Sequence, residues 1–251
     1  MSVFKSLLGA ICAVGAVGCA TADVREQSPP EPVNLNSYIL LDRTGSMSNI
    51  WEEAIGSVNA YVGSVIEPDD GPDVINDITL SVFDAQDGLQ FDTLRRNVDG
   101  EAWSEIGVDE VSPRGMTPLF DAIGRIVTLA EADNPKKAVI VIMTDGKENA
   151  SREFTREGVQ EVLNRVEEKG WQVVFLGAEF ANFGDAEAVG VGYDNRMAVS
   201  VGQLSQTMEN LADKNRSYAQ GLSDTVEFDA EDRAVAEEED VIQRQNQGRS
   251  N

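Results

Sequence analysis

Short apolar segments alternate with segments of helical pattern along most of this chain, and this alternation constrains its fold more than any other feature. Residues 138–143 are six consecutive apolar residues, which is typical of a strand buried on both faces of a sheet. Residues 38–41 form a second run of this kind. A strand with two buried faces needs helices above and below it. We therefore predict a three-layer, doubly wound α/β fold with a mostly parallel sheet.

The elements between and after these two runs complete the pattern. Ile78, Leu80 and Val82 alternate with polar residues, so we expect this strand to have one less-buried face. Residues 86–88 contain Asp-Gly, which predicts a hairpin and hence one antiparallel strand at an edge of the sheet. The other expected elements are helices near 55–65, 119–130, 159–166 and 203–220, and strands near 89–94, 171–176 and 196–201.

The first 22 residues have the composition of a targeting segment. Lys5 precedes a small, apolar stretch, and residues 20–22 (Ala-Thr-Ala) offer a cleavage site, so we predict a signal peptide over residues 1–22. Residues 16–19 offer a competing lipobox, in which Cys19 would become the lipidated first residue and the only membrane anchor. An uncleaved hydrophobic N-terminus is a third alternative. Both export routes predict a protein that is periplasmic, secreted or lipid-anchored at the cell envelope.

Composition divides the remainder into three parts. Residues 23–36 are polar and proline-rich, which predicts a linker before a domain at 37–222. Residues 223–251 are rich in Asp and Glu, and we expect this tail to be disordered. Its role would be to keep the protein soluble, or alternatively to bind a partner.

Charge and residue usage exclude two classes of site. The chain has 44 Asp and Glu against 20 Lys and Arg, a formal charge of −24, which argues against the phosphate contacts of non-specific nucleic-acid binding. It has no His, and its only cysteines are Cys12 and Cys19, which argues against a zinc or iron site with soft ligands. We expect the protein to be a monomer.

Oxygen-bearing side chains gather where the predicted strands end. Asp42, Thr44 and Ser46 follow the first strand, Thr117 precedes a helix, and Asp145 follows the strand at 138–143. In an open parallel sheet such positions meet at one crevice, where the winding direction reverses. Two carboxylates and three hydroxyls suit a hard cation, so we predict Mg²⁺, with Mn²⁺ or Ca²⁺ as alternatives. Each residue could instead cap a turn or a helix.

These residues resemble a known family pattern. Asp42-x-Thr44-x-Ser46 with the distant Thr117 and Asp145 looks like the metal-ion-dependent adhesion site of von Willebrand factor type A domains. The family pattern begins D-x-S-x-S, and the one departure, Thr44, keeps the hydroxyl group. The sequences of residues 117–123, 144–149 and 175–178 also resemble those of small bacterial and phage-encoded type A proteins.

The resemblance implies a binding module and not an enzyme. It implies that Thr44, Ser46 and Thr117 offer hydroxyl oxygens, while Asp42 and Asp145 act largely through coordinated water. A cation held in this way keeps an open position for an acidic side chain of a protein partner, in adhesion or in assembly.

Two other functions remain open from the sequence. A Mg²⁺-dependent phosphatase could use Asp42 as nucleophile, but phosphatases of the haloacid-dehalogenase type carry a second Asp two residues later, where this chain has Thr44. A type A subunit that recruits a motor ATPase or chelatase is the other alternative. The chain has no G-x-x-x-x-G-K-[ST] motif, so that ATPase would be a separate chain.

Overall fold

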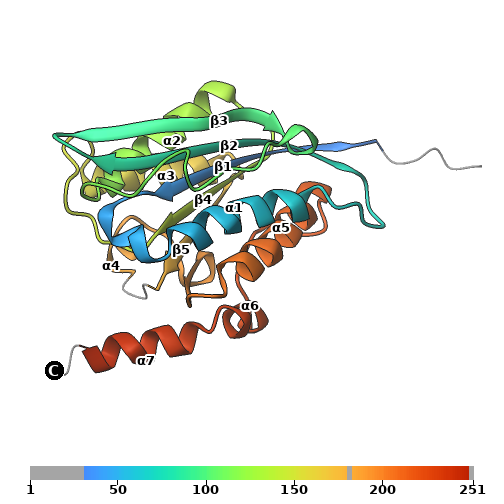
Figure 1. Cartoon of the computed structure of the whole chain (residues 1–251). Coiled ribbons are helices and arrows are strands. Elements are labelled where there is room, and N and C mark those ends of the chain that lie inside the picture. The colour runs from blue at the N-terminus through green and yellow to red at the C-terminus, as the bar shows by residue number, and fades with distance from the viewer. Residues whose placement is uncertain (1–30, 180–182, 249–251) are drawn as a thin grey trace, which may run out of the picture.

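A six-stranded sheet runs through the centre of the protein in the order β3-β2-β1-β4-β5-β6 (Figure 1). The computed structural model describes residues 31–179 and 183–248. All neighbouring strands are parallel except β2 and β3, which are antiparallel. The predicted doubly wound, mostly parallel fold with one antiparallel edge strand is therefore confirmed. The strands are β1 (Val33–Asp42), β2 (Val74–Ala85), β3 (Leu89–Asp99), β4 (Ala138–Thr144), β5 (Gln172–Ala178) and β6 (Arg196–Val199).

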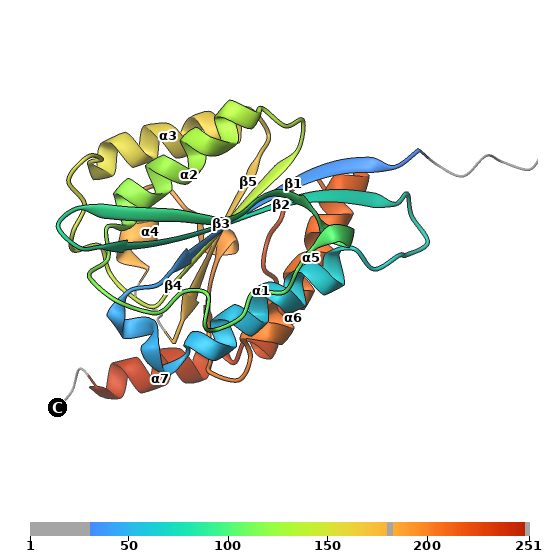
Figure 2. The same ribbon diagram turned by 45° about the horizontal axis from the view of Figure 1, so that its top comes forward.

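Helices cover both faces of the sheet and enclose two apolar cores (Figure 2). On one face α1 packs beside α5, and on the other α2 packs beside α3. The chain adds β2 and β3 on one side of β1 and then β4, β5 and β6 on the other, so the winding reverses between β1 and β4. The helices are α1 (Trp51–Val65), α2 (Leu119–Asp133), α3 (Arg156–Glu168), α4 (Gly184–Ala188), α5 (Leu204–Gln220), α6 (Ala230–Val235) and α7 (Glu238–Gly248).

Strand β2 differs from the expectation of one less-buried face, because it is buried on both faces. Its small polar residues, which suggested exposure, form hydrogen bonds with β3 instead. The Thr79 hydroxyl donates to the side-chain carbonyl of Asn97 at 3.0 Å, and the Ser81 and Thr93 hydroxyls lie 3.0 Å apart. Buried polar groups that find such partners cost little, so an alternating pattern is compatible with an interior strand.

The acidic C-terminal segment also differs from the expected disordered tail. Helices α6 and α7 form within it, and Asp229 begins α6 with a capping box that includes Asp232. Val226 and Phe228 are buried in the same core as α1 and α5. At the other end of the domain, β1 begins at Val33, inside the predicted linker. A few apolar residues spaced among the acids are enough to dock the segment, because each buries its side chain almost completely.

This segment covers the open edge of β6. The backbone N–H of Ala198 donates to a carboxylate oxygen of Glu238 at 2.9 Å, and the N–H of Ser200 donates to the carbonyl of Ala236 at 2.9 Å. Unpaired edge groups would otherwise be available to other strands. The carboxylate of Glu238 also pairs with Arg233 at 2.7 Å. The tail therefore completes the domain at the edge opposite β3.

The predicted signal peptide and Cys19 lie outside the described residues. Within residues 31–179 and 183–248, no helix is long and apolar enough to cross a membrane.

We predict that Phe228→Ala lowers the free energy of unfolding by about 3–5 kcal/mol, because it leaves a cavity in the core under the tail. Leu222→Ala is the matched control, since Leu222 is 75% exposed and its truncation should change stability by less than about 0.5 kcal/mol. Urea unfolding followed by circular dichroism measures both. Equal effects of the two substitutions would mean that the tail does not pack on the domain in solution.

Candidate metal centre

The predicted site residues come from three loops at the carboxyl edge of the sheet, beside the point where the winding reverses. Asp42 is the last residue of β1, and Asp145 directly follows β4. These two strands are parallel neighbours, with Leu41 paired to Met143. The ends of both strands are therefore level with each other. Thr117 lies two residues before α2, and its hydroxyl is 3.4 Å from that of Thr44, which places it at the same edge.

A chain of side-chain contacts joins four of the predicted residues. The Ser46 hydroxyl donates to a carboxylate oxygen of Asp145 at 2.6 Å and lies 3.1 Å from the Thr44 hydroxyl. The Thr117 hydroxyl lies 3.4 Å from that of Thr44. The structure thus brings together oxygens from loops that are separated by 73 and 99 positions in sequence.

Asp42 lies at the base of this group of oxygens. The Thr144 hydroxyl donates to one of its carboxylate oxygens at 2.5 Å, and the backbone N–H of Thr44 donates to the other at 2.7 Å. Gly146 stands close by, and a Cβ placed on it would lie 3.1 Å from the Thr117 hydroxyl and 3.8 Å from an Asp42 carboxylate oxygen. A side chain at Gly146 would therefore fill the space between these two residues. The structure gathers all five predicted residues, and we refer to them together as the oxygen cup.

Burial controls the ionisation of both carboxylates in the cup. Burial raises the pKa of Asp42 to about 7, and hydrogen bonds from Thr144 and Thr44 offset only part of this effect. Burial likewise raises the pKa of Asp145, and the bond from Ser46 opposes it. An ionised carboxylate in such a place is stabilised by a nearby positive charge.

The donor set suits a hard cation. Every side-chain ligand on offer is an oxygen atom, and hydroxyls outnumber carboxylates three to two. In the described part of the chain, no group of three or more His, Cys, Asp or Glu could hold a metal ion. The oxygen cup therefore fits a cation that is bound through few carboxylates and keeps water ligands, as Mg²⁺ does.

A buried charge bridge beneath the cup was not foreseen from the sequence. Asp84, at the end of β2, accepts a hydrogen bond from Arg43 at 2.7 Å and one from Arg114 at 3.1 Å. Both Asp84 and Arg43 are almost fully buried. Arg43 lies inside the D-x-T-x-S loop and Arg114 just before Thr117. Asp84 therefore ties two of the three loops to the same strand.

Backbone contacts strengthen this tie. The N–H of Arg114 donates to the carbonyl of Arg43 at 2.7 Å, and the N–H of Gly45 donates to the carbonyl of Gly115 at 3.3 Å. Gly115 has a φ of 74°, and a Cβ on it would lie 2.4 Å from the carbonyl oxygen of Ala85. Only glycine fits there, so Gly115 sets the course of the chain into Thr117.

The third loop holds Thr117 from the other side. The side-chain carbonyl of Asn149 accepts from the N–H of Thr117 at 2.8 Å, and the N–H of Asn149 donates to the carbonyl of Thr117 at 3.0 Å. Glu148 accepts from the N–H of Phe120 in the first turn of α2 at 3.0 Å. Asp121 accepts from three backbone N–H groups, those of residues 152–154. Glu148 and Asp121 therefore position loops and do not face the cup.

No protein-family model matches this chain, and no curated protein matches it. Solved structures of type A domains do match in fold. One is the von Willebrand factor domain of the type V pili tip protein Mfa5 from Porphyromonas gingivalis, with 11% identity and a TM-score of 0.55 over 75% of this chain and 97% of that one.

Two further structures with this fold are of metal-loaded proteins. Manganese-loaded TRAP protein from Plasmodium vivax has 17% identity and a TM-score of 0.51, over 69% of this chain and 71% of that one. Proximal thread matrix protein 1 from the mussel byssus, with a zinc-occupied adhesion motif, has 17% identity and a TM-score of 0.52 over 74% of this chain. This chain spans about half of that protein, 49% of its length. The fold is thus the von Willebrand factor type A fold, as the sequence pattern predicted.

We predict that Asp84→Ala lowers the free energy of unfolding by about 2–3 kcal/mol. It removes the buried acceptor that Arg43 and Arg114 share and leaves Arg43 with the more exposed Asp92, at 2.6 Å, as its remaining carboxylate. Asp87→Asn is the control in the same hairpin, because Asn removes the charge and tolerates the φ of 63° at this position, where Ala would be strained. The side chain of Asp87 is 98% exposed and pairs with Arg152 at 3.5 Å, so its loss should cost under about 1 kcal/mol. Denaturant unfolding measures both. A tolerated Asp84→Ala would contradict a structural role for the bridge.

We also predict that Asp42 makes the metal-free protein less stable as the pH rises. Its pKa is about 7 in the folded state against an ordinary 3.8, so between these values the folded state binds more protons than the unfolded state. The resulting cost grows from about pH 4 to pH 7 and reaches roughly 4 kcal/mol at most, at 1.36 kcal/mol per pKa unit. Asp42→Asn removes this cost.

The measurement is urea unfolding of both proteins in EDTA at pH 5 and pH 8. The stability of Asp42→Asn relative to the natural protein should rise between the two pH values. A difference that is the same at both would show that Asp42 titrates normally in the folded state.

Proposed function

We propose that this protein, which has the von Willebrand factor type A fold, is a divalent-metal-dependent module that binds a protein ligand through an acidic side chain of that ligand. The observation that carries the proposal is the oxygen cup. Three loops that are remote in sequence bring three hydroxyls and the Asp145 carboxylate into contact, and the Asp42 carboxylate lies at their base, bonded to the backbone N–H of Thr44 and to the Thr144 hydroxyl. Capping alone does not require such convergence, because a cap satisfies only its own helix or turn.

In this proposal Thr44, Ser46 and Thr117 offer hydroxyl oxygens, and Asp42 and Asp145 offer carboxylates directly or through water. A bound divalent ion would supply a positive centre that two carboxylates and neutral oxygens leave incompletely satisfied. An acidic side chain of a partner is the natural group to complete such a site. The hydroxyls that now bond to Asp145 and to each other are free to turn toward a cation, since a hydroxyl oxygen also accepts.

Mg²⁺ is the ion we propose, with Mn²⁺ or Ca²⁺ as alternatives. The manganese and zinc in the two metal-containing neighbours support a divalent ion in a cup of this kind. The chain's own donors are all oxygens, which favours the harder ions.

The same neighbours support our proposal of an adhesive or assembling role outside the cytoplasm. A pilus tip protein and a byssus matrix protein are among the structures with this fold. The net charge of −24 should repel acidic partners at long range, but at physiological salt the screening length is about 8 Å. The local field of the bound ion should therefore dominate once the two surfaces meet.

The phosphatase alternative is disfavoured by the position of Asp42. Its side chain is fully buried, and both carboxylate oxygens already accept hydrogen bonds from Thr44 and Thr144. A nucleophile must reach a phosphate in an open site. We therefore propose that the protein is not an enzyme.

We predict that Mg²⁺ stabilises the natural protein and that Ser46→Ala removes most of this effect. At a free concentration of 100 times the dissociation constant, the gain should be about 2.7 kcal/mol. For a domain of this size that raises the melting temperature by about 5–10 °C. Thermal unfolding in Mg²⁺ and in EDTA measures the gain.

Ser48→Ala is the matched control, because Ser48 lies two residues further on and its hydroxyl donates to the carbonyl of Gly45 and not to a residue of the cup. It should keep the full response to Mg²⁺. If Mg²⁺, Mn²⁺ and Ca²⁺ all leave the stability of the natural protein unchanged, the oxygen cup is not a metal site.

A second experiment tests the mode of ligand binding. Immobilised natural protein and Asp145→Asn are compared for ligand capture in Mg²⁺ and in EDTA, and capture that persists in EDTA would contradict the proposed mode of binding.

A further inference from the structure

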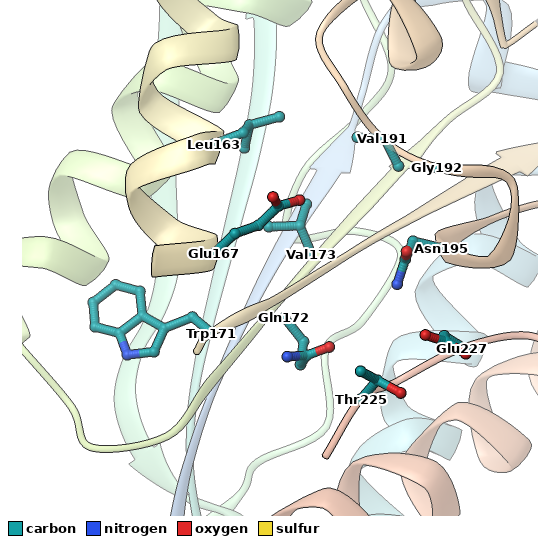
Figure 3. A pocket seen from close by; sticks show the side chains of 10 residues that line it. All are labelled: Leu163, Glu167, Trp171, Gln172, Val173, Val191, Gly192, Asn195, Thr225 and Glu227. Atoms are coloured by element: carbon teal, nitrogen blue, oxygen red, sulfur yellow. The ribbon is translucent and has the colours of Figure 1, made fainter. Parts of the chain in front are cut away.

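A pocket lies at the opposite end of the sheet from the oxygen cup, where β5 begins (Figure 3). Its walls come from the last turns of α3, from the chain after α4 and from the segment that links α5 to α6. Its volume is about 200 Å³, which is enough for one long side chain. We call it the β5 pocket.

The floor of the β5 pocket is apolar and firmly held. Leu163, Val173 and Val191 are buried, and so is the ring of Trp171. The indole N–H of Trp171 already donates to the carbonyl of Pro135 at 3.2 Å. The floor therefore offers apolar contact to an aliphatic chain, and its one polar side-chain atom is already hydrogen-bonded.

The polar atoms around this floor are mainly acceptors, and one N–H of each side-chain amide is already used. The side-chain NH₂ group of Gln172 donates to the carbonyl of Gly170 at 3.1 Å, and that of Asn195 donates to the carbonyl of Val226 at 2.9 Å. Within the described residues, the carboxylates of Glu167 and Glu227 and the side-chain carbonyl of Asn195 form no hydrogen bond or ion pair. Both glutamates are exposed, so a bound cation would replace water at their oxygens. The pocket thus offers more free acceptors than free donors.

The arrangement of the two carboxylates is more specific than the general acidity of the chain. Figure 3 shows Glu167 and Glu227 on opposite sides of the pocket, carried by different segments. Glu167 also lies in the last turn of α3, whose thirteen residues present the negative end of their dipole there. Each of these features favours a cation at the mouth, above an apolar floor.

We propose that the β5 pocket receives a lysine side chain of a partner protein. The aliphatic stem would lie on Leu163, Val173 and Val191, and the ammonium group would donate to Glu167, Glu227 and the carbonyl of Asn195. Long basic side chains bury their stems on apolar surface and keep the charge at the rim in this way. Three donors on one nitrogen match acceptors on separate walls, whereas the planar fork of arginine favours a single carboxylate.

This inference does not depend on the oxygen cup. The two sites lie at opposite ends of the parallel strands, so one domain could hold an acidic group at one end and a basic group at the other. Removal of metal should leave the β5 pocket intact.

The test is a titration of the full chain with N-acetyl-lysine-N′-methylamide, followed by NMR of the backbone amides of Gly192 and Val173 and of the Gln172 side chain. We expect saturable shifts with a dissociation constant on the order of 10 mM, as befits a fragment. Glu167→Gln and Glu227→Gln should each weaken binding about threefold to fivefold, the range of an exposed ion pair. The double substitution should abolish saturation.

Glu168→Gln is the matched control. It removes the same charge one residue from Glu167 but does not line the pocket, so it should bind as the natural protein does. EDTA should have no effect.

Four outcomes would overturn the proposal. They are shifts that do not saturate, equal weakening by Glu168→Gln and Glu167→Gln, binding of n-butylamine without binding of the blocked lysine, and tighter binding of the corresponding blocked arginine. The third would indicate a free amine in place of a partner's side chain, and the fourth a guanidinium site.

Discussion

The parallel pairing of β1 with β4 is the constraint on which the rest of this structure depends. Because the chain leaves β1 in one direction across the sheet and returns to β4 on its other side, the two strands end side by side, and the loops after them cannot close over the gap. Asp42 and Asp145 stand at these ends and are brought together by the sheet alone. Hydroxyl groups, which are neutral, can approach both carboxylates where further acids would repel them.

The fold was predictable because strands that are covered on both faces have continuous runs of apolar residues. The runs at 38–41 and 138–143 identified the two central strands, and the residues that follow them identified the edge that carries the site. Local signals were equally predictable. Asp87 and Gly88, which both have positive φ, form the hairpin turn that the Asp-Gly pair indicated. Because the two strands are parallel neighbours, the residues that follow each of them lie close together in space.

What the sequence did not disclose depends on pairing between distant residues. Thr79 and Ser81 suggested an exposed face, yet partners on β3 allow both to be buried. Asp84 and Arg43 are ordinary charged residues in the sequence, and only the tertiary structure makes them a buried bridge. The tail was misjudged for the same reason, since its net acidity hides Val226 and Phe228, which find a core that other elements provide.

The bridge and the cup together suggest why a charged pair is kept where an apolar contact would serve stability as well or better. A buried ion pair seldom adds net stability over a well-packed apolar substitute, but it fixes direction because its hydrogen bonds are satisfied in one arrangement. Asp84 faces Arg43 on one loop and Arg114 on another, at 2.7 and 3.1 Å. Metal ligands must converge to within a few tenths of an ångström, whereas apolar side chains can slide. On this argument, the bridge serves the geometry of the oxygen cup, and its cost in desolvation is offset by a site whose loops cannot separate without exposing Arg43.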